Sequence, residues 1–198
     1  MNLLDLLFPK KCLECCKNGK YICINCLNKV LDGTFGETNY SIFKYQGVIK
    51  KAIVAIKYKF ATDIVDELVD ASVERLKSRK LHNVAFVPIP LHIHRSNWRG
   101  FNQSEIIGKK IAEKLNWEFV PDLLIRNKNT TPQVGLKSFD RHQNMSGVFS
   151  VSSRYIQYSK PNILIFDDVY TTGSTMKEAK KVLKNSGFKR IYSLTIAR

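Results

Sequence analysis

Two stretches of this chain combine residue types and spacings that can do chemistry, and the more C-terminal of them spans residues 163–175. Residues 163–166 form a short apolar run, which is typical of a strand buried on both faces, and a helical pattern begins at Met176. Between the two stand the adjacent carboxylates of Asp167 and Asp168. Because open α/β sheets bind ligands at the carboxyl ends of their strands, we expect both acids at a binding edge.

Residues 171–175 supply hydroxyl and free backbone N–H groups at a helix N-terminus: Thr171, Thr172, Gly173, Ser174 and Thr175. Such N–H groups and the helix dipole favour an anion, and Gly173 permits the left-handed turn that lets successive amides converge on it. Two acids beside an anion site need other ligands, and sugar hydroxyls or a hydrated Mg²⁺ suit them. The stretch therefore predicts a site for a sugar phosphate with a metal. The alternative is an ordinary N-capped helix after a strand.

The second stretch holds all five cysteines of the chain, between residues 12 and 26. Cys12 and Cys15 form one C-x-x-C pair, and Cys23 and Cys26 form another. Four thiolates in two such pairs are typical of a tetrahedral structural zinc site, which leaves no open position for catalysis. Cys16 is left over and can replace Cys15 in principle. Disulfide bonds are the alternative, and the absence of an export signal disfavours them.

Length and charge set the frame for both sites. The 198 residues suffice for one α/β domain with a small appendage, and the net charge of +15 suits a polyanionic partner such as nucleic acid or a polyphosphate. Scattered lysines on a solvated surface would give the same charge. The apolar residues 1–8 lack a basic region before them and are too short to span a bilayer, so we expect a cytoplasmic protein.

The remaining patterns describe alternating strands and helices that would position these sites. We expect strands at 40–45, 84–87 and 189–196, in addition to the one at 163–166. Helical stripes cover 49–58 and 64–76, another helix begins at Gln103, and 33–39 reads as a linker. This order predicts an α/β fold with a mostly parallel sheet.

The loop between the strand at 84–87 and the helix at Gln103 carries Arg95 and Arg99. Basic side chains between a parallel strand and a helix N-terminus suit a second anion. His92 and His94 in the same loop are weak evidence for a metal pair, since no third ligand is in view.

Two other polar segments have open interpretations. Residues 126–133 are basic and poor in apolar side chains, which predicts a mobile lid over the site. Residues 57–60 interleave lysines with aromatic rings, a pattern that serves single-stranded nucleic acid but more often marks a helix end with its rings packed in the core.

Residues 163–175 resemble the phosphoribosyl-pyrophosphate motif of the type I phosphoribosyltransferases, with apolar residues, two acids and a Thr-Thr-Gly-x-Thr loop. Nearly the whole chain resembles the ComF family of competence-associated proteins. The marks of that resemblance are the four cysteines and residues 45–47, 57–58, 88–103, 126–149 and 167–175. It implies a type I phosphoribosyltransferase-like, Rossmann-like sheet flanked by helices in residues 39–198, after a zinc-finger segment and linker in residues 1–38.

The resemblance also implies roles for individual residues. Asp167 and Asp168 would address the ribose hydroxyls of phosphoribosyl pyrophosphate and, with Arg99, form the catalytic group. Arg95 would lie near the pyrophosphate. The 5′-phosphate would be held by residues 170–175, which are Tyr170, Thr171, Thr172, Gly173, Ser174 and Thr175.

The function that the resemblance implies is handling of single-stranded DNA in natural transformation, with phosphoribosyl pyrophosphate and Mg²⁺ bound and a structural zinc. Partners would be other competence proteins, such as a DNA-translocating helicase or a recombination mediator, at the inner face of the membrane. Whether transfer chemistry occurs stays open, because no segment reads as a nucleobase pocket. The alternatives are a non-catalytic adaptor for DNA or protein, a phosphoribosyltransferase of nucleotide metabolism, and a response-regulator receiver, against which the intact loop after Asp168 argues.

Overall fold

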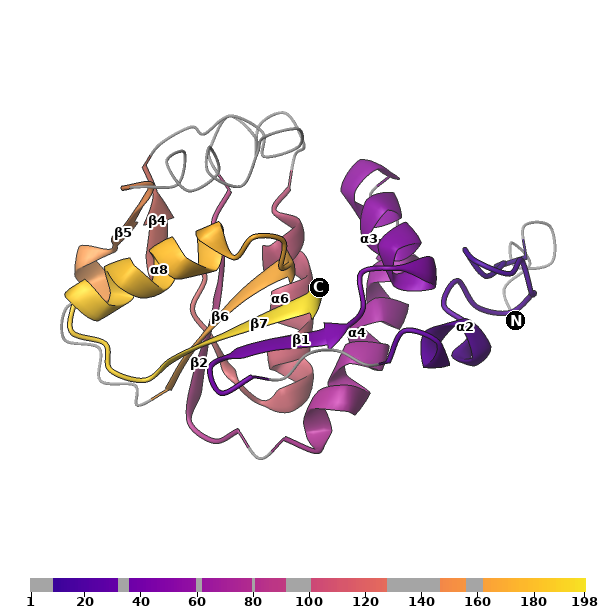
Figure 1. Ribbon diagram of the computed structural model, residues 1–198, viewed down its shortest axis with the longest axis horizontal. Coiled ribbons are helices and arrows are strands. Elements are labelled where there is room, and N and C mark those ends of the chain that lie inside the picture. Colours follow the sequence, from indigo (N-terminus) through magenta and orange to yellow (C-terminus); the bar gives the residue numbers. More distant parts are fainter. Residues whose placement is uncertain are drawn as a thin grey trace.

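Five parallel strands make the central sheet, in the order β1-β7-β6-β2-β3 (Figure 1). The computed structural model describes residues 9–31, 36–59, 62–79, 81–91, 101–127, 147–155 and 162–198. The strands are β1 (Asn39–Phe43), β2 (Val84–Pro88), β3 (Glu118–Phe119), β6 (Asn162–Val169) and β7 (Ile191–Ala197). A parallel sheet needs helical crossovers, and the helices predicted from the apolar periodicity supply them.

Helices cover both faces of this sheet, as its continuous apolar strands require. One face carries α3 (Gly47–Lys59), α4 (Thr62–Lys77) and α6 (Gln103–Leu115). The opposite face carries α8 (Ser174–Asn185) and a small antiparallel pair, β4 (Leu124–Arg126) with β5 (Phe149–Val151), which is followed by a short 3₁₀ turn at Ser153–Tyr155. The predicted fold class, a mostly parallel sheet flanked by helices, is confirmed.

Strand β6 shows why the sheet has two cores. Leu164 and Phe166 pack with the α3, α4 and α6 layer, whereas Ile163 and Ile165 pack with the α8 layer. This alternation follows from the two-residue period of a strand. All four side chains are almost fully buried, so β6 can only be a central strand.

The cysteine segment lies against the helical layer rather than apart from it. In its described residues this segment has one helix, α2 (Ile24–Asn28), which is short. Its buried residues Cys12, Ile22 and Cys26 belong to the apolar core that α3 and α4 form. Figure 1 shows this indigo segment beside α3 and α4, away from α8. The predicted boundary between residues 1–38 and 39–198 therefore falls within one continuous apolar cluster.

Some expected elements differ in extent. Arg126 was expected in a lid, but it ends strand β4, and its guanidinium carbon lies 5.5 Å from the ring centroid of Phe149. The short strands β3, β4 and β5 are additions, because runs of two or three residues carry too little periodicity to be recognised. The predicted lid residues 128–133 and the loop residues 92–100, with His92 and His94, lie outside the described residues.

Three aromatic rings packed on one face of the sheet give a test of this core. The ring of Phe86 lies 5.1 Å from that of Phe166 and 5.6 Å from that of Trp117, and Phe86 is fully buried. We expect Phe86→Ala to lower the free energy of unfolding by about 3–5 kcal/mol, because it leaves a cavity at the centre of the sheet. Urea denaturation measures the loss. Ile125→Ala, at a side chain that is 44% exposed, should change it little, and equal losses in both variants would contradict the assigned core.

Candidate functional site

The two acids lie inside strand β6 rather than after it. The apolar run suggested a strand that ends at Phe166, but pairing with β7 continues, with Asp167 opposite Thr195 and Val169 opposite Ala197. Both carboxylates are half-buried. The sheet ladder therefore holds the backbone of the acid pair rigidly at the carboxyl end of the strand.

Asp167 is the more constrained of the two acids. Its Oδ1 accepts hydrogen bonds from the hydroxyl of Ser104 at 2.8 Å and from the backbone N–H of Asp168 at 2.9 Å. Burial, together with the neighbouring Asp168 carboxylate, raises the pKa of Asp167 to about 7, although these two hydrogen bonds favour its charged form. Such a carboxyl is poised to gain stabilisation from a cation or from hydroxyl donors.

Ser104 was not among the predicted site residues, and it arrives from helix α6. Asn102 caps this helix, because its Oδ1 accepts from the N–H of Ser104 at 3.2 Å. The Asn102 amide also donates to the carbonyl of Ile89, just after β2, at 3.1 Å. Since β2 pairs with β6, this contact fixes the α6 N-terminus beside the acids. The sequence signal that could have pointed to Ser104 was the N-cap residue Asn102, which marks the start of the helix that follows β2.

The loop after β6 folds tightly onto the start of α8. Gly173 precedes the helix with a φ of +75°, in the left-handed region, and a Cβ at this position would lie 2.2 Å from the hydroxyl oxygen of Tyr170. A side chain here would be strained by the backbone conformation and would force the Tyr170 ring to move. The hydroxyls of Thr172 and Ser174 lie 2.8 Å apart, and Ser174 N–H points to Thr172 Oγ1 at 3.4 Å.

The structure thus brings residues 167–175 together at one edge of the sheet, with the N-terminus of α8 facing it. The arrangement offers N–H groups and a helix dipole to an anion, and carboxylates to hydroxyls or a cation. The ligand roles assigned to residues 167–175 stay predictions. Arg95 and Arg99 lie outside the described residues, so their predicted place at this edge stays a prediction as well.

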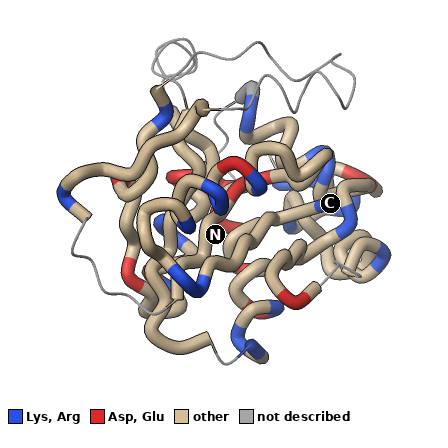
Figure 2. Tube along the Cα trace, turned by 60° about the vertical axis from the view of Figure 1, so that its left-hand side comes forward, with Lys and Arg blue, Asp and Glu red and all other residues tan. Residues whose placement is uncertain are grey.

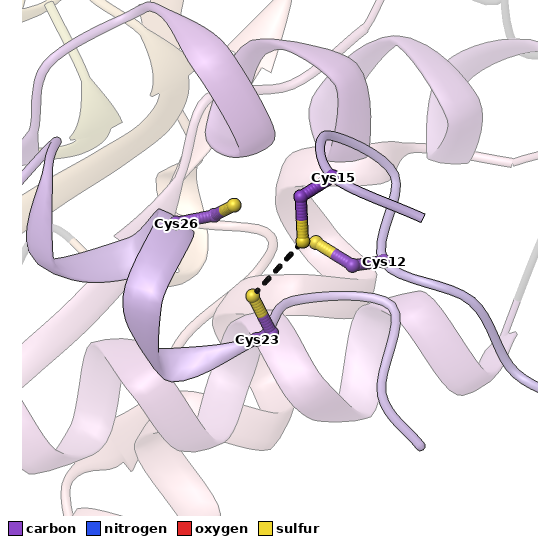
Figure 3. Close-up of side chains that lie close together, drawn as sticks. All are labelled: Cys12, Cys15, Cys23 and Cys26. Atoms are coloured by element: carbon purple, nitrogen blue, oxygen red, sulfur yellow. Dashed lines mark hydrogen bonds between the residues drawn. The ribbon is translucent and has the colours of Figure 1, made fainter. Parts of the chain in front are cut away.

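The four paired cysteines form a second candidate site. The sulfur atoms of Cys12, Cys15, Cys23 and Cys26 all lie within 4.8 Å of one another, and those of Cys15 and Cys23 are 3.6 Å apart. Figure 3 shows the four side chains converging on one point from the loop before α2 and from α2 itself. A tetrahedral zinc site with Zn–S bonds of about 2.3 Å places its sulfurs roughly 3.8 Å apart. The four cysteines could therefore hold a zinc ion.

The thiols also show the electrostatic need for a cation. Burial raises the pKa of Cys12, but the backbone N–H groups of Cys15, Cys23 and Glu14 outweigh it and hold that pKa at about 6. Burial and the neighbouring sulfurs raise the pKa of Cys26 to about 12. Four sulfurs at this separation cannot all ionise together unless a metal balances their charge.

Contacts with α3 and α4 fix the cysteine segment in place. Glu67 accepts the N–H of Ile22 at 2.8 Å, Lys10 pairs with Asp63 at 2.9 Å, and Lys51 pairs with Glu14 at 2.9 Å. The fifth thiol, Cys16, is exposed and has a φ of +61°. It stands outside the cluster that the other four form.

The chain is similar in sequence to several known proteins, although no family model matches it. Competence protein F of Haemophilus influenzae is 32% identical over 114 residues, 58% of this chain and 50% of that protein. Competence protein ComFC of Streptococcus pneumoniae is 28% identical over an alignment of 200 positions, which covers 100% of this chain and 79% of that protein.

DNA utilization protein YhgH of Escherichia coli strain K12 is 30% identical over 101 residues, 51% of this chain and 43% of that protein. The chain thus spans about half the length of the Haemophilus and Escherichia proteins. These similarities confirm the resemblance to the ComF family.

Two solved structures that are similar to the chain are adenine phosphoribosyltransferases. The enzyme of Trypanosoma brucei shares 12% identity at a TM-score of 0.49, covering 84% of this chain and 74% of that chain. The enzyme of Thermoanaerobacter pseudethanolicus shares 11% at a TM-score of 0.42, covering 88% of this chain and 99% of that chain.

The cysteine cluster predicts a tightly held metal. We expect one zinc ion per chain in the purified protein, lost in Cys26→Ser, with a lower melting temperature because Cys26 belongs to the core shared with α3 and α4. Metal analysis and thermal unfolding measure both effects. Cys16→Ser is the matched control and should keep the zinc. Loss of zinc from that variant, or zinc-free native protein, would contradict the assigned ligand set.

Asp167 predicts an unusual dependence of stability on pH. Its folded pKa of about 7 exceeds the ordinary 3.8, so the folded state holds a proton that the unfolded chain has released. The free energy of unfolding should therefore fall as pH rises from about 4 to about 7, by up to about 1.4 kcal/mol per pH unit from this group. Asp167→Asn should flatten that slope in urea denaturation between about pH 4 and 7. An unchanged slope would show that Asp167 titrates normally.

Proposed function

We propose that this chain, which is similar to ComFC competence proteins over its whole length, acts in DNA uptake and binds phosphoribosyl pyrophosphate with Mg²⁺. The names of its relatives, competence and DNA utilization proteins, support the biological role. One observation supports the proposed ligand: an acid pair and a helix N-terminus meet at the carboxyl edge of a parallel sheet. That combination suits a ligand with hydroxyls, a cation and phosphates together.

Each part of the site would bind one part of the ligand. The 5′-phosphate would lie against the N–H groups of residues 172–175, where the α8 dipole favours negative charge and Gly173 leaves the backbone accessible. Asp167 and Asp168 would accept hydrogen bonds from the ribose hydroxyls, and Mg²⁺ would offset their charge. Ser104 would orient Asp167 toward the ligand through the 2.8 Å hydrogen bond.

Zinc in the four-cysteine cluster would have a structural role. All four positions of a tetrahedral ion would be filled by sulfur, so no site for water or substrate would be left. Because Cys12 and Cys26 are buried against α3 and α4, the ion would stabilise the helical layer as well as its own segment.

The cellular role would be to handle incoming single-stranded DNA in the cytoplasm. The net charge of +15 supports attraction to a polyanion. The described helices include none that is long and apolar enough to cross a membrane. The partners that this role implies are a DNA-translocating helicase or a recombination mediator, met at the inner face of the membrane.

Calorimetric titration with phosphoribosyl pyrophosphate tests the ligand proposal. The zinc-loaded protein should bind it only with Mg²⁺, and Asp168→Asn should weaken binding at least tenfold because one of the two hydroxyl-accepting carboxylates loses its charge. Gly173→Ala should abolish binding, since a Cβ there displaces Tyr170 and distorts the loop.

Asp70→Asn provides the matched control for charge. Asp70 is an exposed acid on α4 that pairs with Lys114 at 2.6 Å, on the helical layer away from the loop. This variant should bind like the wild type. No binding by the wild-type protein at millimolar ligand, or equal loss in the Asp70 and Asp168 variants, would sink the proposal.

A further inference from the structure

Three segments that are far apart in sequence meet beside the candidate ribose-phosphate site. The backbone N–H of Tyr45, just after β1, donates to the carbonyl of Arg198 at 2.7 Å, and the N–H of Arg198 donates to Phe43 at 3.1 Å. The N–H of Tyr170, just after β6, donates to the carbonyl of Ala197 at 2.8 Å. Because β7 lies between β1 and β6, the three residues Tyr45, Arg198 and Tyr170 form a row along the carboxyl edge. Figure 1 shows the arrowheads of these three strands at the same end of the sheet.

The side chains of this row pair cations with aromatic rings. The guanidinium carbon of Arg198 lies 5.3 Å from the ring centroid of Tyr170. The Nζ of Lys50, in the first turn of α3, lies 5.9 Å from that of Tyr45. Both cations are exposed and both rings half-buried. Among the described residues, no ion pair joins either cation to a carboxylate within 4.0 Å.

Charge alone does not distinguish this edge from the rest of the molecule. Lysines and arginines occur throughout the described trace (Figure 2). Three of the lysines pair with aspartates of α4, in the ion pairs Lys10–Asp63, Lys110–Asp66 and Lys114–Asp70. The carboxyl edge differs because two exposed cations and two partly exposed rings lie in one row there. Nucleobases stack on aromatic rings and on guanidinium planes, while cations attract the phosphates between them.

We propose that Tyr45, Lys50, Tyr170 and Arg198 form a stacking subsite for single-stranded DNA. This inference rests on the proposed role in DNA handling and gives that role a face of the molecule. Tyr170 belongs to both sites, since it lies between Asp168 and Thr171 in the chain. A base stacked on this row would therefore lie beside the sugar-phosphate site.

The test uses fluorescence anisotropy of the zinc-loaded full chain with two labelled oligonucleotides of equal length and charge, one of thymidines and one of abasic residues. Tyr45→Leu and Arg198→Gln should each weaken binding of the thymidine oligonucleotide by roughly 5- to 150-fold, the loss expected for one stacked base. Tyr45→Leu should leave binding of the abasic oligonucleotide unchanged, because phosphates contact the cations and not the ring.

Two variants on the opposite edge of the sheet serve as matched controls. Arg190→Gln removes an exposed guanidinium just before β7, and Tyr192→Leu removes a half-buried ring near the start of that strand. Neither should weaken binding of the thymidine oligonucleotide more than twofold. Circular dichroism of all four variants checks that the fold is kept.

Distinct outcomes overturn distinct claims. Equal losses for both oligonucleotides in Tyr45→Leu, or no loss in either edge variant, would overturn the stacking subsite and leave DNA binding to another face. Failure of the wild-type protein to bind either oligonucleotide would overturn the proposed DNA role together with this subsite. Titration of the Tyr45 and Arg198 variants with phosphoribosyl pyrophosphate should give wild-type affinity, so a failure of the sugar-phosphate site is seen separately.

Discussion

The sugar-phosphate site and the proposed stacking subsite both depend on one constraint, the parallel pairing of β6 with β2 and β7. Parallel strands end at the same edge, so residues that follow each of them meet even when the sequence separates them widely. The acid pair on β6, the capped start of α6 after β2, and Arg198 after β7 become neighbours in this way. The buried apolar side chains of β6 fix its register, since a shift by one residue would exchange the two cores.

The acid pair destabilises the protein when no ligand is bound, and this destabilisation points to a role in binding. A half-buried carboxyl with a pKa near 7 beside a second carboxylate destabilises its own charged form. The fold offsets this with the Ser104 hydroxyl and a backbone N–H but provides no lysine or arginine contact among the described residues. Groups held in such an environment often serve a ligand rather than stability. The raised pKa of Asp167 therefore agrees with the proposed sugar-phosphate site.

The cysteine cluster shows a related coupling between a site and the fold. A segment with one short helix has little core of its own, so it shares the apolar cluster of α3 and α4 and adds a backbone hydrogen bond to Glu67. The metal that the four sulfurs could hold would then stabilise two layers at once. This arrangement explains how so short a segment keeps a defined position on the sheet domain.

The sequence by itself determined the local features of this protein. Apolar periodicity located α3, α4, α6, α8 and the main strands, and residue spacing located Asp167, Asp168, the loop around Gly173 and the four cysteines, because each of these signals lies within a short window of chain. Only the tertiary structure decided which distant groups meet. Ser104 reaches Asp167 across 63 positions, and Tyr45 reaches Arg198 through sheet pairing. Such contacts depend on strand order and register, which the summed burial of the whole core selects and no single segment encodes.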